Sequence, residues 1–194
     1  YRYEKSGELS GLTRVRALTQ DDCHIFCTPE QIGEEFGRAL DLISEVLATY
    51  GMTDYRIRLS LRGEEGKYVA DDDKWRRAED ALRAALDAKG VAYDPVEGEA
   101  AFYGPKADFM ARDALGREWQ LSTIQVDFIQ PERLGCKYIG EDGQEHTPVV
   151  IHRAVTGSTE RFMAVMIEHF AGAFPAWLAP VQAVIIPIAD RHHD

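Results

Sequence analysis

The ten residues Leu18–Cys27, with the sequence LTQDDCHIFC, carry the side-chain types that most often do chemistry in proteins. They include two aspartates, one histidine and two cysteines. Such a set can bind a metal through imidazole and thiolate, or can supply a pair of acids for proton transfer. It can equally form a strand whose polar side faces water. Which side chains share a face decides between these interpretations.

Strand alternation divides this segment into two faces. One face carries Gln20, Asp22, His24 and Phe26, and the other carries Asp21, Cys23, Ile25 and Cys27. Because both cysteines point away from His24, a zinc site built from this segment alone is disfavoured. His24 would need a partner from elsewhere, and His152 in VVIHRAV is the best placed. Taken singly, each histidine is more often a core or surface group.

The preceding segment, residues 11–18 (GLTRVRAL), also alternates, which predicts a strand with Arg14 and Arg16 on one face. Arginines at one end of a cleft and Asp22 with His24 at the other would suit an anionic ligand beside an amine. The alternative is a polar face that is simply solvated.

A second candidate lies at residues 157–161 (GSTER), where a helix is predicted to begin. The free N–H groups of a first helical turn favour anions, and Arg161 beside them can bind phosphate or can simply be solvated. The sequence contains no P-loop, G-x-G-x-x-G or G-x-S-x-G motif, so nucleotide binding by those routes is not supported.

Polar residues of a third region, Tyr103, Lys106, Gln120 and Gln125, surround a predicted hairpin. Gln120 and Gln125 differ in strand parity, so both can face one pocket only if the strand bulges near Ser122–Thr123.

The elements that would position these residues alternate between strands and helices. A helix is predicted from the Thr28, Pro29 and Gln31 cap to Gly51. The remaining expected elements are strand 55–62, helix 73–89, a hairpin within 106–129 that turns at Leu115–Gly116, strand 147–155, helix 157–172 and strand 181–189. This order predicts an α+β fold, not a βαβ series.

Composition narrows the functional class. The 194 residues carry a net charge of −11, which argues against a protein that wraps nucleic acid without regard to sequence. Three cysteines are too few for a disulfide framework, which predicts reduced thiols and a cytoplasmic location. No run of residues is apolar and long enough for a membrane span, so no membrane association is expected.

Several segments together resemble the catalytic core of class II aminoacyl-tRNA synthetases, and within them the threonyl-tRNA synthetase family. YRYEKSGELSGLTRVRALTQDDCHIF is similar to motif 2 and VVIHRAVTGSTERFMAVMIEHF to motif 3. AFYGPKADF and WQLSTIQVDF resemble the strands between these motifs, and FPAWLAPVQAVIIPI resembles the start of an anticodon-binding domain. TQDDCH with IHRA points to the threonine branch, with the prolyl and seryl enzymes as sibling alternatives.

The resemblance implies a class II antiparallel β-sheet flanked by helices. Residues 1–176 would be a partial catalytic domain, with motif 2 at about 1–27 and motif 3 at about 149–172. Residues 177–194 would be a linker and the first strand of an α/β anticodon-binding domain. Motif 1 and a cysteine that supplies the family's third zinc ligand would lie upstream. We therefore expect a chain truncated at its N-terminus that binds zinc weakly and has little activity alone.

The resemblance also implies a reaction: ATP activates threonine to threonyl-adenylate, and the threonyl group then moves to the 3′ end of tRNA(Thr). Arg2 would hold the α-phosphate and Glu4 the adenine side, with Gln120 near the nucleotide. Arg14 and Arg161 would neutralise the outgoing phosphates together with Mg²⁺. Arg2 and Arg161 are the implied catalytic residues.

For the amino acid, the resemblance implies that Asp22 binds the ammonium group, with Gln20, Tyr103 and Gln125 around the substrate. His24 and His152 would bind Zn²⁺, and the full-length protein would be a homodimer. The alternative is a synthetase-like paralogue that regulates or binds. Arg2, Glu4 and Arg161 count against it, because such a paralogue is expected to lose its phosphate-binding residues.

Overall fold

The computed structural model of the protein describes residues 1–189 and residue 191. Its main sheet comprises β1 Gln20–Cys27, β2 Tyr55–Leu61, β3 Tyr93–Glu97, β4 Lys106–Arg112, β5 Glu118–Asp127 and β8 Val149–Ser158. Beside it lies a two-stranded hairpin of β6 Tyr138–Ile139 and β7 Glu145–His146. The helices are η1 Ser6–Glu8, η2 Pro29–Gln31, α1 Ile32–Thr49, α2 Asp72–Ala88, α3 Gln130–Arg133 and α4 Thr159–His169.

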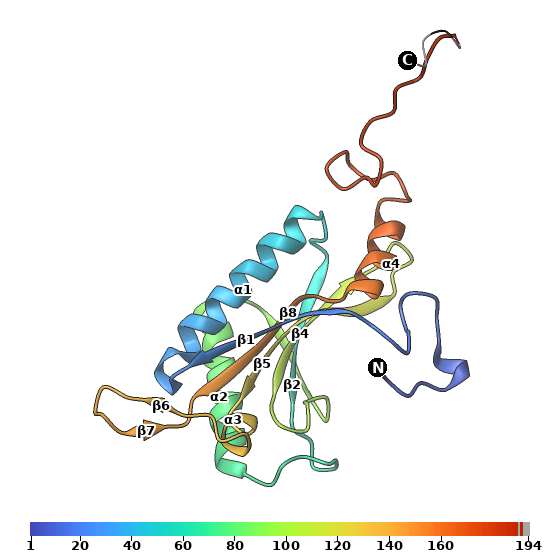
Figure 1. Ribbon diagram of the computed structural model, residues 1–194. Helices are drawn as coiled ribbons and strands as arrows, with labels where there is room; N and C mark the ends of the chain where they lie inside the picture. Colours follow the sequence, from blue (N-terminus) through green and yellow to red (C-terminus); the bar gives the residue numbers. More distant parts are fainter. Residues whose placement is uncertain (190, 192–194) are drawn as a thin grey trace.

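The main sheet has the strand order β1-β8-β5-β4-β2-β3. Its neighbouring strands are antiparallel except for β2 and β3, which are parallel. Helices α1 and α2 cover one face of this sheet, as Figure 1 shows. The α+β class and the mainly antiparallel sheet predicted from the sequence are confirmed.

The start and end of α1 follow from local chemistry. Thr28 and Gln31 form the predicted capping box, and Pro29 stands in the first turn. The helix ends before Gly51, whose φ of 75° lies in the left-handed region that favours glycine. The buried side chains of α1 include the predicted stripe Ile32, Phe36, Leu40, Ile43 and Leu47.

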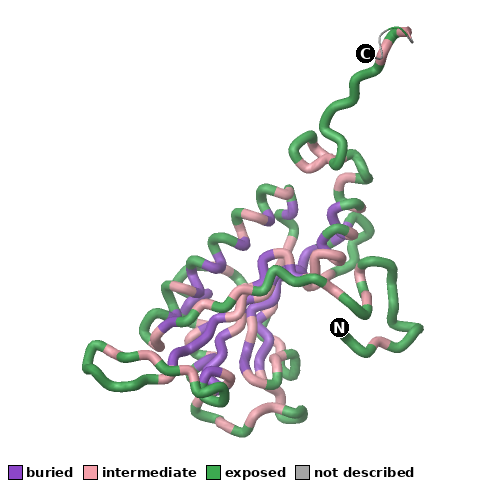
Figure 2. The backbone as a smooth tube through the Cα atoms, viewed as in Figure 1, coloured by how far each residue is buried: buried purple, intermediate pink, exposed green. Residues whose placement is uncertain are grey.

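The core lies between the two helices and the sheet, where Figure 2 shows the buried segments gathered. Fully buried side chains come from every layer: Phe36 and Ile43 of α1, Leu82 and Leu86 of α2, and Leu59, Phe109, Ile124 and Ile151 of the sheet. Residues that alternate with these sheet positions therefore point to the opposite face, which α1 and α2 leave uncovered.

The predicted strand at residues 11–18 is wrong. This segment forms turns and one isolated bridge between Ser10 and Arg14, and the strand begins only at Gln20. Because no strand forms here, Arg14 and Arg16 do not share a strand face. Arg14 donates to the Glu4 carboxylate, and Arg16 donates to the Glu4 main-chain carbonyl. Local alternation cannot make a strand where no neighbouring strand pairs with it.

The predicted strand at 181–189 is also not formed. No strand pairs with this segment among the described residues, and Ile185 and Ile188 are each 93% exposed. The described part of the segment runs away from the sheet in Figure 1.

Other elements were not predicted. Strand β3 contains Pro95, which removes one backbone donor and is tolerated at a sheet edge, so its polar sequence gave little strand signal. The β6–β7 hairpin and the single-turn helix α3 are too short for a periodic pattern. No helix in the described part of the chain is long and apolar enough to cross a membrane.

Candidate functional site

Two rows of side chains cross the sheet on the face opposite α1 and α2. Because pairing partners in adjacent strands lie side by side, the register fixes both rows. One row runs His24, His152, Gln125, Lys106 and Ser60. The next runs Asp22, Ala154, Thr123, Asp108 and Arg58. Polar groups far apart in the sequence are thus brought together on one face.

Irregular pairing between β1 and β8 separates the roles of the two adjacent aspartates. The register shifts between Gln20 and Asp22, and the carboxylate of Asp21 accepts hydrogen bonds from the backbone N–H groups of Val155, Thr156 and Gly157. Asp21 therefore stabilises the irregular backbone of β8, while Asp22 faces the site. They are not an acid pair.

Gly157 is required by this irregularity. Its φ is 68°, and a Cβ atom there would lie 2.0 Å from the carbonyl oxygen of Leu121. The close approach lets β8 pass β5 and lead directly into α4, whose N-cap is Ser158.

Strand β5 contains a bulge, which is the condition for Gln120 and Gln125 to face one pocket. Asp108 pairs with Thr123 and Met110 pairs with Gln120, so β5 has one more residue than β4 between these pairs. The extra residue lies at Leu121–Ser122 and changes the strand's parity. Gln120, Thr123 and Gln125 consequently line the same cavity.

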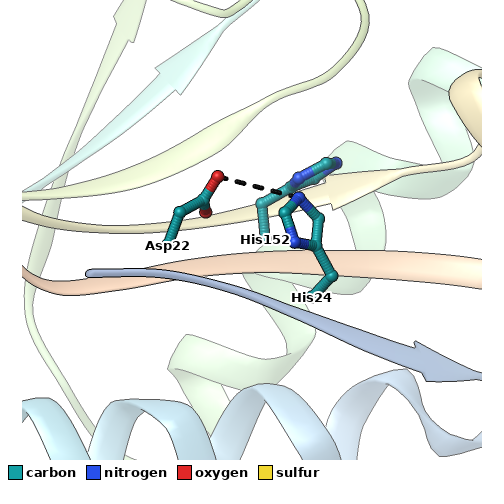
Figure 3. Close-up of side chains that lie close together, drawn as sticks. All are labelled: Asp22, His24 and His152. Carbon is teal, nitrogen blue, oxygen red and sulfur yellow. Dashed lines mark ion pairs between the residues drawn. The ribbon is translucent and has the colours of Figure 1, made fainter. Parts of the chain in front are cut away.

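His24 and His152 face each other across β1 and β8, as the sequence predicted (Figure 3). Their ring centroids are 4.7 Å apart. The carboxylate of Asp22 lies 3.7 Å from Nε2 of His24, and one ligand atom from each of the three residues lies within 4.8 Å of the other two. Two imidazoles and one carboxylate at this spacing suit a divalent transition metal such as zinc.

Asp127 orients His152 for such a role. Its buried carboxylate lies 2.9 Å from Nε2 of His152, and an ionised carboxylate can only accept, so Nε2 carries the hydrogen. The lone pair of Nδ1 is then available to a metal. Neither Cys23 nor Cys27 joins this cluster in the described part of the chain, in agreement with the predicted faces.

Tyr103 and Gln125 meet beside the histidines. The Tyr103 hydroxyl donates to Oε1 of Gln125 at 2.6 Å, and its ring centroid lies 5.4 Å from that of His152. Burial, together with the charges of Asp127 and Asp22, raises the pKa of Tyr103 to about 12. Tyr103 therefore stays protonated and remains a donor across the physiological range.

Arg161 marks the other end of the site. Its guanidinium donates to the carbonyl oxygens of Thr13 and Gln120 and forms no ion pair with a carboxylate within residues 1–189. Burial and the positive charges of Arg2 and Arg14 lower its pKa. A half-buried guanidinium surrounded by like charge favours an anion beside it.

The structure does not bring every predicted residue to the cavity. Glu4 and Arg14 pair with each other at 3.0 Å and do not line it. The hydrogen bond from Arg14 lowers the pKa of Glu4, which stays ionised at neutral pH. Arg14 lies close enough to Arg161 for its positive charge to help lower the Arg161 pKa.

Two adjoining hollows are lined by most of the remaining predicted residues, but not by His24 or Tyr103. A cavity of about 370 Å³ is lined by Arg2, Gln20, Asp22, Gln120, Gln125 and His152, among others. A smaller hollow of about 90 Å³ continues from it to Ser158 and Arg161. Two larger hollows, of about 580 and 740 Å³, lie between the end of β1 and the β6–β7 hairpin and contain none of the predicted site residues. Most of the predicted site residues therefore line the two smaller hollows and not the two larger ones.

Sequence reasoning missed the acids that support the site, Asp108 and Asp127, together with Thr123 and Glu99 on its wall. A signal was present, because both aspartates interrupt apolar strand sequences, ADFMA and IQVDF. A carboxylate in such a position must have partners when it is buried.

Comparison with known proteins gives consistent results at the level of sequence and structure. Residues 1–170 match the family model "tRNA synthetase class II core domain (G, H, P, S and T)". The chain is 78% identical over 193 residues to a protein of Rubrobacter xylanophilus and 58% identical over 195 residues to one of Thermus thermophilus, both called "Threonine--tRNA ligase". The two matches cover 99% and 100% of this chain, respectively. The chain spans only 30% of the length of either relative.

A solved structure is similar as well. The RNA binding domain of threonyl-tRNA synthetase from Cryptosporidium parvum superposes with a TM-score of 0.86 at 46% identity, over 91% of this chain and 44% of that one.

Proposed function

The chain belongs to the class II tRNA synthetase core domain family, and we propose that it is the catalytic-core part of a threonine–tRNA ligase. The full-length protein would activate threonine with ATP and transfer it to the 3′ end of tRNA(Thr). The support is the similarity to threonine–tRNA ligases, of whose length the chain spans 30%. The prolyl and seryl enzymes are the sibling alternatives.

One observation carries the proposal. Two adjoining hollows run from Arg161, which forms no ion pair with a carboxylate within residues 1–189, to Asp22 and His152, beside which the imidazole of His24 lies. Such a site can hold a polyphosphate at one end and an amine with a hydroxyl at the other. Activation of an amino acid requires that ATP and the amino acid bind side by side on one surface.

On the nucleotide side, Arg2 would hold the α-phosphate, and Arg14 and Arg161 the outgoing pyrophosphate. Class II synthetases in general use ATP with Mg²⁺, which would share this charge. Glu4 would meet the adenine and Gln120 the nucleotide nearby. In this structure Arg14 binds Oε2 of Glu4, which would leave Oε1 for the adenine.

On the amino-acid side, Asp22 would bind the ammonium group, with Gln20, Tyr103 and Gln125 around the substrate. The threonine carboxylate would then attack the α-phosphate, and pyrophosphate would leave. No side chain needs to act as nucleophile, because positioning and stabilisation of the phosphate charge supply the catalysis.

His24 and His152 would hold a zinc ion, and the neighbouring oxygen of Asp22 lies within reach of the same position. When bound, zinc would supply open coordination positions for the amine and hydroxyl of threonine. Valine lacks that hydroxyl and would be rejected, whereas serine lacks only a methyl group and would be excluded poorly.

Further parts of the proposal concern the whole protein. We assign residues 177–194 to a linker and the beginning of an anticodon-binding domain, and we place the protein in the cytoplasm as a homodimer. Its partners would be ATP, threonine and tRNA(Thr).

ATP–pyrophosphate exchange on the full-length gene product tests the proposal. Exchange should depend on threonine, respond weakly to serine, and not respond to proline or valine. Chelation of the metal, or the His24→Ala change, should remove the threonine response together with stoichiometric zinc. Exchange driven by proline without a threonine response would overturn the assignment. Absence of exchange with every amino acid would favour the regulatory paralogue.

A further inference from the structure

Asp108 is a fully buried carboxylate directly beneath the cavity. Its side chain is 0% exposed, and it lies in the middle of β4. Its two oxygens accept hydrogen bonds or ion pairs from donors on three strands: Arg58, Ser60, Lys106, Gln120 and Thr123. A buried charge is stable only when it is paired and hydrogen-bonded in this manner, so Asp108 depends on these five donors.

The five donors divide into two groups. Arg58 and Ser60 come from β2 and do not line the cavity. Lys106, Gln120 and Thr123 do line it. Asp108 itself is not a lining residue, so any ligand in the cavity meets the groups that Asp108 holds and not Asp108.

The carboxylate fixes the orientation of the Gln120 amide. Because a carboxylate can only accept, the group of Gln120 that faces it must be the NH₂ group. That nitrogen also donates to Oγ1 of Thr123 at 2.9 Å, and the Thr123 hydroxyl donates to Asp108 at 2.8 Å. Both amide hydrogens are thereby used, and Oε1 is left as an acceptor; no donor meets it within residues 1–189.

Asp108 also fixes the position of the Lys106 ammonium. Nζ of Lys106 lies 2.8 Å from Oδ2 of Asp108, while the lysine side chain is 14% exposed on the cavity wall. Arg58 binds the same oxygen at 3.1 Å and reaches Glu99 at 3.4 Å. Two cations and two carboxylates thus balance here, and Lys106 is held as a cation at one place on the wall.

We propose that Asp108 is the positioning residue for the nucleotide side of the site. It holds Gln120 with its amide oxygen free to accept from the ligand, and it holds the Lys106 ammonium beside it. It also closes the β5 bulge, because Gln120 and Thr123 stand on either side of Leu121–Ser122 and share one oxygen of Asp108. The inference rests on the proposed function.

The Asp108→Asn change tests this inference on the full-length gene product. The new amide can offer N–H where Gln120 needs an acceptor, and it removes the partner of Lys106. We expect the KM for ATP in pyrophosphate exchange to rise about tenfold, while the KM for threonine stays within about twofold. Ser60→Ala is the matched control, because it removes one hydrogen bond to the same carboxylate from outside the cavity; both KM values should stay within about twofold.

A double-variant comparison separates positioning from loss of stability. If Asp108 acts in part through Gln120, the rise in the KM for ATP caused by Asp108→Asn should be smaller when Gln120 is already alanine, and the remaining rise should reflect the loss of the partner of Lys106. Equal effects on the two KM values, or full additivity with Gln120→Ala, would overturn the inference. Inactive wild-type protein would instead overturn the proposed function.

A spectroscopic measurement covers the case in which Asp108→Asn does not fold. In the wild-type chain, the side-chain NH₂ signals of Gln120, identified by their loss in Gln120→Ala, should exchange slowly with solvent. Signals that exchange as fast as those of an exposed glutamine would contradict the inference.

Discussion

Arg161 shows at the scale of one residue why the site favours an anion. Its backbone acceptors fix the guanidinium, and its charged neighbours, Arg2 and Arg14, have the same sign. An arginine so placed gains its counter-charge only from a ligand. A solvated first-turn arginine, the other interpretation of GSTER, would not donate to two carbonyl oxygens from distant segments.

Replacing Arg161 with glutamine should lower kcat/KM for ATP by roughly 100-fold, because one or two charge-assisted hydrogen bonds to phosphate would be lost. Pyrophosphate exchange at saturating threonine measures the effect. Arg133→Gln removes the same charge from an exposed position outside both hollows and serves as the control. A loss of less than about threefold in Arg161→Gln would place the phosphates elsewhere.

Cys27 should be chemically inert in the folded protein. It is 6% exposed, and burial together with the charge of Glu35 raises its pKa to about 11. Since the thiolate is the reactive form, iodoacetamide at pH 8 should leave Cys27 unmodified while it modifies the more accessible Cys136. Mass spectrometry of peptides from the folded and the denatured protein measures the rate at which each cysteine is alkylated. If Cys27 reacts as fast in the folded protein as in the denatured one, its assignment to the buried face of β1 is wrong.

At the scale of elements, the turn between β4 and β5 is held by one carboxylate. Asp113 is buried, and it accepts from the backbone and guanidinium of Arg117 and from the indole of Trp119. Arg117 also forms an ion pair with Glu168 of α4. The turn therefore connects the β4–β5 hairpin, which carries Gln120 and Gln125, to the helix that carries Arg161.

Low pH should weaken the hydrogen bonds that Asp113 accepts, over a pH range set by its pKa. Burial alone would raise the pKa of Asp113, but the hydrogen bonds from Trp119, Arg117 and Leu115 outweigh it and lower the pKa from 3.8 to about 2. A lowered pKa in the folded state stabilises the protein above the unfolded-state pKa, and this contribution is lost as the pH falls from about 3.8 through 2.

Asp113→Asn should therefore cost about 2 kcal/mol of unfolding free energy at pH 7, with a smaller difference from wild type below pH 3. Urea unfolding at both pH values measures it, and Glu65→Gln, an exposed loop carboxylate, is the control. An unchanged difference at the two pH values would contradict the assignment.

The elements also show what sequence reasoning reaches and where it stops. The sequence pattern predicted the helices α1, α2 and α4, each of which buries an apolar stripe, and the strands β1, β2, β4, β5 and β8. It failed at 11–18 and 181–189, where alternation exists without a partner strand. The His24–His152 pairing was predictable from strand faces. The local sequence marks Asp108 and Asp127 as acids within apolar strands, but their partners depend on long-range register, which no local pattern contains.

At the scale of the whole molecule, the two faces of the main sheet have different roles. One face holds the core against α1 and α2, and the other carries the polar rows and the cavity. Residues 174–178 still contact the domain, since Phe174 and Leu178 pack on the core and Trp177 lies 5.4 Å from Tyr50. Beyond them the described apolar side chains are largely exposed.

A chain that ends at residue 180 should unfold at the same temperature as the chain of 194 residues, within about 1 °C. A chain that ends at residue 173 should unfold several degrees lower, because it loses the contacts of Phe174, Trp177 and Leu178. Circular dichroism melting of the three chains gives the comparison. A large loss on removal of 181–194 alone would show that this segment belongs to the core domain.

We propose that this chain carries the threonine-activating site of a threonine–tRNA ligase. Transfer of labelled threonine to tRNA by the full-length gene product tests it most directly. Threonine should become esterified to tRNA(Thr) in an ATP-dependent reaction, and Arg161→Gln should reduce the transfer at limiting ATP while Arg133→Gln should not. Esterification of proline or serine in place of threonine, or no transfer with any amino acid, would contradict the claim.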